Sequence, residues 1–240
     1  MSFLLVLVGS IVFALVCKKP LKVAPWAFYA AAIVLDVLFI VDATTRMPGL
    51  VHDGLYLLIH KCTLATALFV VVMYIGVFRK DGWVSQQLRP VRAELSILAW
   101  LLALGHVALY LGSYVTRLAS GIARPAVALS LGVALLLLVL LLVLGVTSFN
   151  GVKKRMSKTQ WRRVQKWAYP FFGLVYVHLM LMLAPAALQG GAAAQASVAV
   201  YTVVFGGYAV GRTVRAVADR RVAKNEKAAE LALDEELCLS

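Results

Sequence analysis

Two of the four histidines in the sequence, His106 and His178, lie deep inside long apolar runs. A neutral imidazole costs less free energy in such a run than a charged group, but its polar nitrogens still need partners. Two histidines at similar depth on different membrane helices are the axial ligand set of a six-coordinate haem iron. The residues alone leave a second interpretation open, in which the two histidines are unrelated and each is hydrogen-bonded to a serine, a tyrosine or a carbonyl group.

The depth of each histidine follows from its distance to the nearest basic residue. His106 comes fourteen residues after Arg92, and His178 comes twelve residues after Lys166. In a helix these separations correspond to roughly 21 Å and roughly 18 Å. If both helices run in the same direction, the two imidazoles lie at similar depth, nearer the outer face of the membrane.

Two further polar residues lie within apolar runs. His60 is a weaker alternative ligand, or a histidine of the bundle interior beside the snorkelling Lys61. Asp36 is the carboxylate deepest in an apolar run, where an acid is costly and usually has a partner. It could orient a ligand histidine, pair with Lys61 or relay protons. His52 is expected in a solvated outer loop.

The composition identifies an integral membrane protein. Of the 240 residues, 62% are hydrophobic, and the mean hydropathy is +0.87. We predict an all-α, multi-pass helical bundle of about seven transmembrane helices. We interpret the first apolar segment as a retained helix, because no small-residue cleavage site follows it. The predicted segments are 2–17, 25–43, 54–78, 93–116, 125–147, 167–188 and 196–212.

Basic residues cluster in alternate connections between these segments. The basic clusters are Lys18, Lys19 and Lys22, then Arg79, Lys80, Arg89 and Arg92, then residues 153–166, and then Arg212, Arg215, Arg220 and Arg221. The other connections hold Arg46, or Arg117 and Arg124, or no basic residue. The positive-inside rule then predicts an outside N-terminus and an inside C-terminus in the cell inner (plasma) membrane. The net charge of +13 is accounted for in this way and does not indicate nucleic-acid binding.

We expect residues 1–213 to form the transmembrane bundle and residues 214–240 to form a charged cytoplasmic helical tail. The three cysteines show no paired spacing, so neither a disulfide framework nor a zinc site is expected.

Two stretches carry a resemblance to a known family. RPVRAELSILAWLLALGHVALYL and LGVTSFNGVKKRMSKTQWRRVQKWAYPFFGLVYVHLMLM resemble the ferric reductase-like transmembrane domain, over about residues 50–210. Within that family they are most similar to the haem-binding membrane subunit of periplasmic methionine sulfoxide reductase systems. The resemblance implies one b-type haem between His106 and His178.

The sequence departs from the family pattern at the inner end. Gln165 stands where such a segment carries an inner histidine, and Arg92 stands where two-haem relatives carry another. Neither is a normal haem ligand, so we expect a single haem. A guanidinium and a carboxamide suit a flavin or quinone oxygen better than iron. Alternatively, both side chains only solvate the ends of their helices.

The predicted function is transmembrane electron transfer from a cytoplasmic-side flavoprotein or quinol donor to a redox partner or acceptor at the outer face. The sequence has no nicotinamide fingerprint or flavin domain, and no catalytic residue is predicted. The basic loop around Trp161 and Trp167 could anchor the protein at the membrane surface or dock an anionic donor. The competing hypothesis is a cofactor-free transporter or scaffold subunit that uses Asp36 and His60 as a polar pathway.

Overall fold

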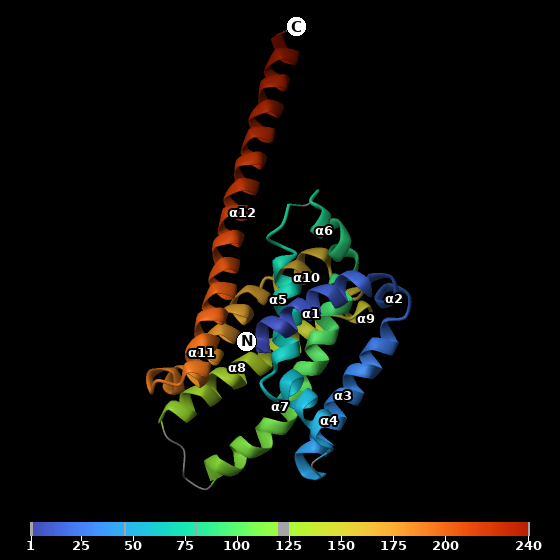
Figure 1. Ribbon diagram of the computed structural model, residues 1–240. Coiled ribbons are helices and arrows are strands. Elements are labelled where there is room, and N and C mark those ends of the chain that lie inside the picture. The colour runs from blue at the N-terminus through green and yellow to red at the C-terminus, as the bar shows by residue number, and fades with distance from the viewer. Residues whose placement is uncertain (1, 46, 80, 120–124, 240) are drawn as a thin grey trace.

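The structure is a computed structural model that describes residues 2–45, 47–79, 81–119 and 125–239. Within these ranges all regular secondary structure is helical, which confirms the predicted all-α membrane bundle (Figure 1). Arg46, Lys80 and Arg124, which the topology argument used, lie outside the described residues. The helices are α1 (Ser2–Val16), α2 (Lys18–Val23), α3 (Pro25–Thr45), α4 (Gly49–Leu55), the π-helix η1 (Tyr56–His60), α5 (Thr63–Tyr74), α6 (Trp83–Leu88), the 3₁₀-helix η2 (Arg89–Val91), α7 (Arg92–Ala119), α8 (Pro125–Ser148), α9 (Asn150–Lys153), α10 (Lys158–Gln165), α11 (Ala168–Leu188) and α12 (Ala192–Leu239).

Each of the seven predicted apolar segments is helical, but they are not equally long. By length and composition, five helical stretches of the described chain can cross a membrane, or six if α4–η1 and α5 form one bent span. The remaining segment, α1, is apolar over Phe3–Val16. Fourteen residues of helix reach about 21 Å, short of a hydrocarbon core of about 30 Å. The predicted count of seven and the sidedness of the termini therefore stay predictions.

The segment predicted as one continuous helix over 54–78 is broken in the structure. The π-helix η1 ends at His60, and Cys62 then adopts a left-handed conformation with φ of 54°. The helices on either side meet at an angle of 45°. A positive φ interrupts the helical hydrogen-bond ladder, and the Cys62 N–H donates to the Ile59 carbonyl at 2.8 Å in a tight turn instead.

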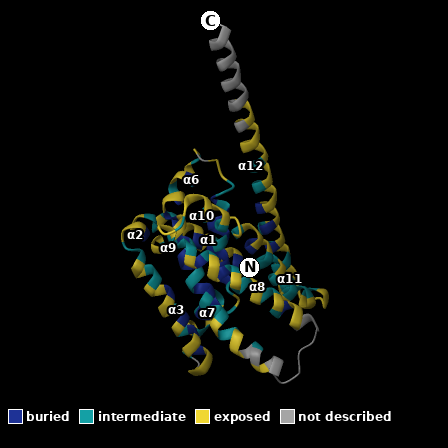
Figure 2. Cartoon of the chain, turned by 180° about the vertical axis from the view of Figure 1, so that it is seen from behind, coloured by how far each residue is buried: buried dark blue, intermediate teal, exposed yellow. Residues whose placement is uncertain are grey.

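Helices α5 and α7 form the centre of the bundle. Helix α5 packs against α1 and α7, while α7 also packs against α3 and α8. Small residues permit some of these approaches: a methyl group at Gly145 of α8 would overlap the Trp100 ring of α7, and one at Gly211 of α12 would meet Val77. Many large apolar side chains of the membrane-spanning helices are exposed, as lipid contact requires, and exposed positions run along the outward faces of these helices (Figure 2).

The elements that carry the basic connections lie at one end of the bundle, and α4 lies at the other (Figure 1). The basic end is tied together by Lys22 of α2, which donates to the carbonyl of Pro90 at 3.0 Å and pairs with Glu94 at 2.9 Å. Helix α12 leaves the bundle at this end and continues without a break to Leu239. The predicted boundary between residues 213 and 214 therefore falls within one helix and stays a prediction.

Candidate functional site

The two histidines predicted as haem ligands come from separate helices that share a neighbour. His106 lies on α7 and His178 on α11. Helix α11 packs mainly against α8 and α12, and α8 also packs against α7. His178 and His60 both lie within electrostatic range of the His106 ring. The fold therefore gathers three of the four histidines in one region.

The ring nitrogens of His106 and His178 have an unusual environment. The Nδ1 atom of each is buried and has no hydrogen-bond partner among the described residues. The backbone of Ile59 and His60, at the break before α5, lies close to the His106 ring. An imidazole that binds a metal through one nitrogen commonly donates its other N–H to a backbone carbonyl. Here neither Nδ1 makes that second bond within the described chain, so each is an unpartnered ring nitrogen that could itself bind a metal, and two neutral imidazoles fit the axial ligand set of a haem.

His60 has a different role in the structure. Its Nδ1 is hydrogen-bonded to the Tyr110 hydroxyl at 2.7 Å, and its ring stacks on Tyr56 with centroids 3.9 Å apart. The Tyr110 ring in turn lies 4.6 Å from the ring of His106. His60 is therefore engaged on one nitrogen and supports His106 through Tyr110. The sequence reasoning missed Tyr110, although its position four residues after His106 puts both on one helix face.

The aromatic cluster extends toward the end of the bundle that carries α4. His52, predicted to be solvated, has 35% of its side chain exposed and also bonds through Nδ1 to the buried carboxylate of Asp42 at 2.8 Å. Its ring lies 5.9 Å from Tyr56. A series of rings thus runs from His52 through Tyr56, His60 and Tyr110 to the ring of His106.

Asp36 is buried on α3, with 8% of its surface exposed, and its Oδ1 has no hydrogen-bond partner. The ion pairs of the described chain include none between Asp36 and Lys61. The side chain packs instead against Gly105, where an added methyl group would overlap it. Asp36 therefore sets the spacing of α3 and α7 beside His106.

The two residues predicted at the inner end have separate surroundings. Gln165 donates to the Thr147 hydroxyl at 3.1 Å, beside Trp161, which donates to the Thr147 carbonyl at 3.1 Å. Arg92 instead lines a cavity of about 200 Å³, and Gln165 is not among its lining residues. Gln165 thus fastens α10 to α8, while Arg92 belongs to a different pocket.

Within the described ranges, no group of three or more histidine, cysteine, aspartate or glutamate side chains could hold a metal ion. A haem iron differs from such an ion, because the porphyrin supplies four of its ligands and the protein supplies the axial ones.

The fold and its apolar helices define a multi-pass membrane protein. Within it, residues 61–176 match the family model described as the ferric reductase like transmembrane component. The matched range begins at Lys61, directly after His60, and it includes Arg92 and His106. It ends two residues before His178. It supports a membrane redox or electron-transfer role for the chain.

An uncharacterized protein of Treponema pallidum (strain Nichols) is 36% identical over 218 residues, which cover 88% of this chain and 60% of the relative. The chain thus spans about 60% of that relative's length. No solved structure matches the chain.

Proposed function

We propose that this protein carries electrons across a cell inner (plasma) membrane with one b-type haem held between His106 and His178. The observation that carries the proposal is the pair of buried Nδ1 atoms without partners, on histidines of two helices, α7 and α11, that both pack against α8. The ferric reductase-like domain supports the same chemistry. A buried ring nitrogen without a partner is costly unless a ligand satisfies it.

The residues of this chain would bind and position the group. His106 and His178 supply neutral imidazoles from two helices, and α8 provides an apolar partner to both helices. Tyr110 limits the rotation of the His106 ring, and its hydroxyl is held in turn by His60. A haem bound there supplies reversible one-electron exchange, with a potential set by its axial ligands and its burial.

The direction of transfer rests on the basic connections. We assign them to the cytoplasmic side, which gives an outside N-terminus and an inside C-terminus. Electrons would come from a flavoprotein or a membrane quinol and would leave to a redox partner at the outer face. The resemblance to the membrane subunit of methionine sulfoxide reductase systems supports an extracytoplasmic protein as that acceptor. A flavin or quinone near Arg92 would cover the inner part of the path.

The absorption spectrum of the purified full-length chain tests the proposal. We expect a Soret band with a low-spin signature that His106→Ala and His178→Ala abolish. His60→Ala is the matched control, because it removes a histidine of the same region and should keep most of the band. A colourless wild-type protein would favour the cofactor-free transporter or scaffold. Equal loss of haem in His60→Ala and His178→Ala would show that the ligand assignment is wrong.

A further inference from the structure

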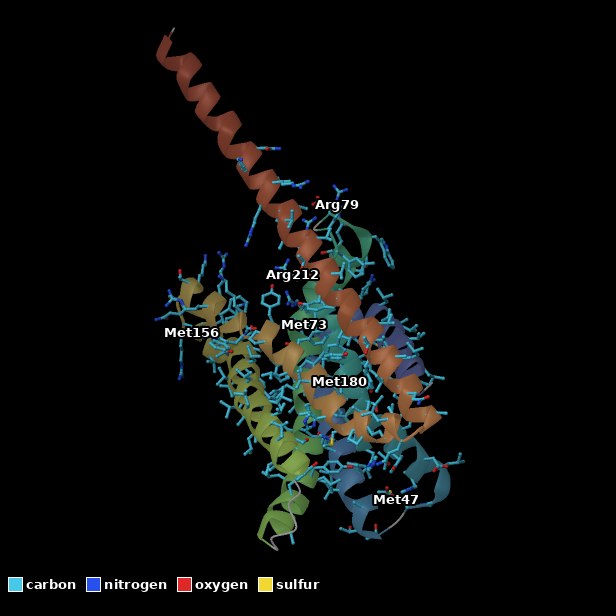
Figure 3. All side chains as sticks on the ribbon, turned by 90° about the vertical axis from the view of Figure 1, so that its left-hand side faces the viewer. Met47, Met73, Arg79, Met156, Met180 and Arg212 are labelled. Carbon is cyan, nitrogen blue, oxygen red and sulfur yellow. The ribbon has the colours of Figure 1, made fainter. Side chains whose placement is uncertain are left out.

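A second site lies at the basic end of the bundle, away from the histidines. It is a cavity of about 200 Å³ formed where the end of α5, the start of α7, the start of α11 and the middle of α12 meet. Figure 3 places Arg212 close to Met73, and both residues line this cavity. The polar groups that line it are mostly arginines and tyrosines: Arg89, Arg92, Arg212, Arg215, Tyr169 and Tyr208.

The charges around the cavity do not balance. Four arginines line it with one carboxylate, Asp219, which pairs with Arg215 at 2.8 Å. The ion pairs of the described chain include none for Arg92 or Arg212. Membrane anchoring requires basic residues at the surface, but it does not require them to converge on one hollow from three separate elements. Such convergence costs free energy unless an anion is present.

One of these arginines is already held in place. Arg212 donates to the Tyr169 hydroxyl through Nη2 at 2.8 Å and through Nε at 3.2 Å, and its guanidinium lies 5.3 Å from the centre of the Tyr169 ring. A fixed guanidinium loses less conformational entropy when it binds a planar or tetrahedral oxyanion. The side chain is therefore preorganised on the cavity wall.

Tyr208 gives an independent indication of a ligand. The residue lines the cavity with only 7% of its surface exposed, and its hydroxyl is buried without a hydrogen-bond partner. Its ring is fixed by contacts with Tyr74 and Phe172. A buried hydroxyl normally has a partner, so this group is an unused donor at the wall of an arginine-lined cavity.

We propose that this cavity binds a phosphate group, with Arg92 and Arg212 as its main cationic ligands and Tyr208 as a neutral donor. Guanidinium groups match phosphate oxygens in bidentate geometry, and Arg92 and Arg212 reach the cavity from two different helices, α7 and α12. The phosphate belongs to an anionic lipid headgroup or to a soluble phosphate ester. This proposal does not rest on the haem, but it shares Arg92 with the inner position proposed above for a flavin or quinone, and a flavin phosphate is one soluble phosphate ester of this kind.

The test uses the purified full-length protein and two probes. Inorganic phosphate is titrated in neutral detergent, with binding followed by calorimetry and by thermal stabilisation. In parallel, retention of phosphatidylglycerol is measured by native mass spectrometry after reconstitution in vesicles of phosphatidylcholine and phosphatidylglycerol. The variants are Arg92→Gln, Arg212→Gln and Tyr208→Phe. Arg163→Gln, an exposed arginine on α10 outside the cavity, is the matched control.

We expect Arg92→Gln and Arg212→Gln each to weaken binding by about tenfold or more, as the loss of a hydrogen bond to a charged group implies. Tyr208→Phe should weaken it by about threefold or more, and Arg163→Gln should leave it within about twofold. Binding of inorganic phosphate without selective retention of phosphatidylglycerol identifies a soluble phosphate ester as the source, and selective retention of phosphatidylglycerol, with or without phosphate binding, identifies a lipid headgroup. If neither probe binds, or if the control loses as much binding as the cavity variants, the proposal is wrong.

Discussion

The close approach of α3 to α7 beside the candidate haem ligand gives the sharpest prediction. Gly105 directly precedes His106, and a methyl group at this position would overlap Cβ, Cγ and Oδ1 of Asp36. Asp36 is buried and belongs to a helix that packs closely on α7, so it has little room to withdraw. We expect Gly105→Ala to force α3 and α7 apart.

The size of the effect follows from two opposing contributions. Overpacking of this kind costs about 1–3 kcal/mol. Replacing glycine by alanine inside a helix returns about 0.5–1 kcal/mol. The free energy of unfolding should therefore fall by up to about 2.5 kcal/mol in Gly105→Ala.

Gly112 on the same helix provides the matched control, since a methyl group there has no atom within 4 Å. Gly112→Ala should keep only the helix-propensity gain and become slightly more stable. The clash in Gly105→Ala should disappear in the double variant Asp36→Gly/Gly105→Ala, because Asp36→Gly removes all three atoms that the new methyl group would overlap. The two sites should thus show a coupling free energy of about 1–3 kcal/mol.

The assay is reversible unfolding in mixed micelles, followed by the helical circular dichroism signal. It is run on Gly105→Ala, Gly112→Ala, Asp36→Gly and the double variant Asp36→Gly/Gly105→Ala. The same samples are scanned for haem absorption, because a displaced α7 moves His106. Equal stability of Gly105→Ala and Gly112→Ala would refute the close approach of α3 and α7. An unrelieved penalty in the double variant would show that Asp36 is not its cause.

Three further predictions concern other parts of the bundle. Tyr110→Phe should keep the ring packed beside the histidines but lose the hydrogen bond to His60, so the free energy of unfolding should fall by about 0.5–1.5 kcal/mol. The haem band should be retained, and its loss would contradict this prediction. Gly211→Leu should clash with Val77 and lower the melting temperature, whereas Gly206→Leu, at a position with open space, should change it little; equal effects would show that α12 does not approach α5 there. A pyridine haemochrome assay should give one haem per chain, and a value of two would show that the inner end also binds haem.

Much of the fold could be predicted from hydropathy, because each helix in lipid must satisfy its own backbone hydrogen bonds. The seven apolar segments all carry helices, although 54–78 is broken, and the depth of His106 and His178 calculated from sequence spacing stays a prediction. The break at Cys62 could not be predicted, since no glycine or proline marks it. It is maintained by packing around the π-helix, which periodicity does not report.

The sequence by itself therefore determined the class of protein, the helices and the candidate haem ligands, because these depend on local composition and on short spacings. Only the tertiary structure decided which polar groups meet. It joined His60 to Tyr110, assigned Gln165 to Thr147 and gathered arginines that lie more than 100 residues apart around one cavity. Such encounters depend on how each helix is rotated and on its choice of neighbours. Both are set by side-chain packing at close approaches such as that of Gly105 to Asp36. A hydropathy pattern along the sequence contains no information on such contacts.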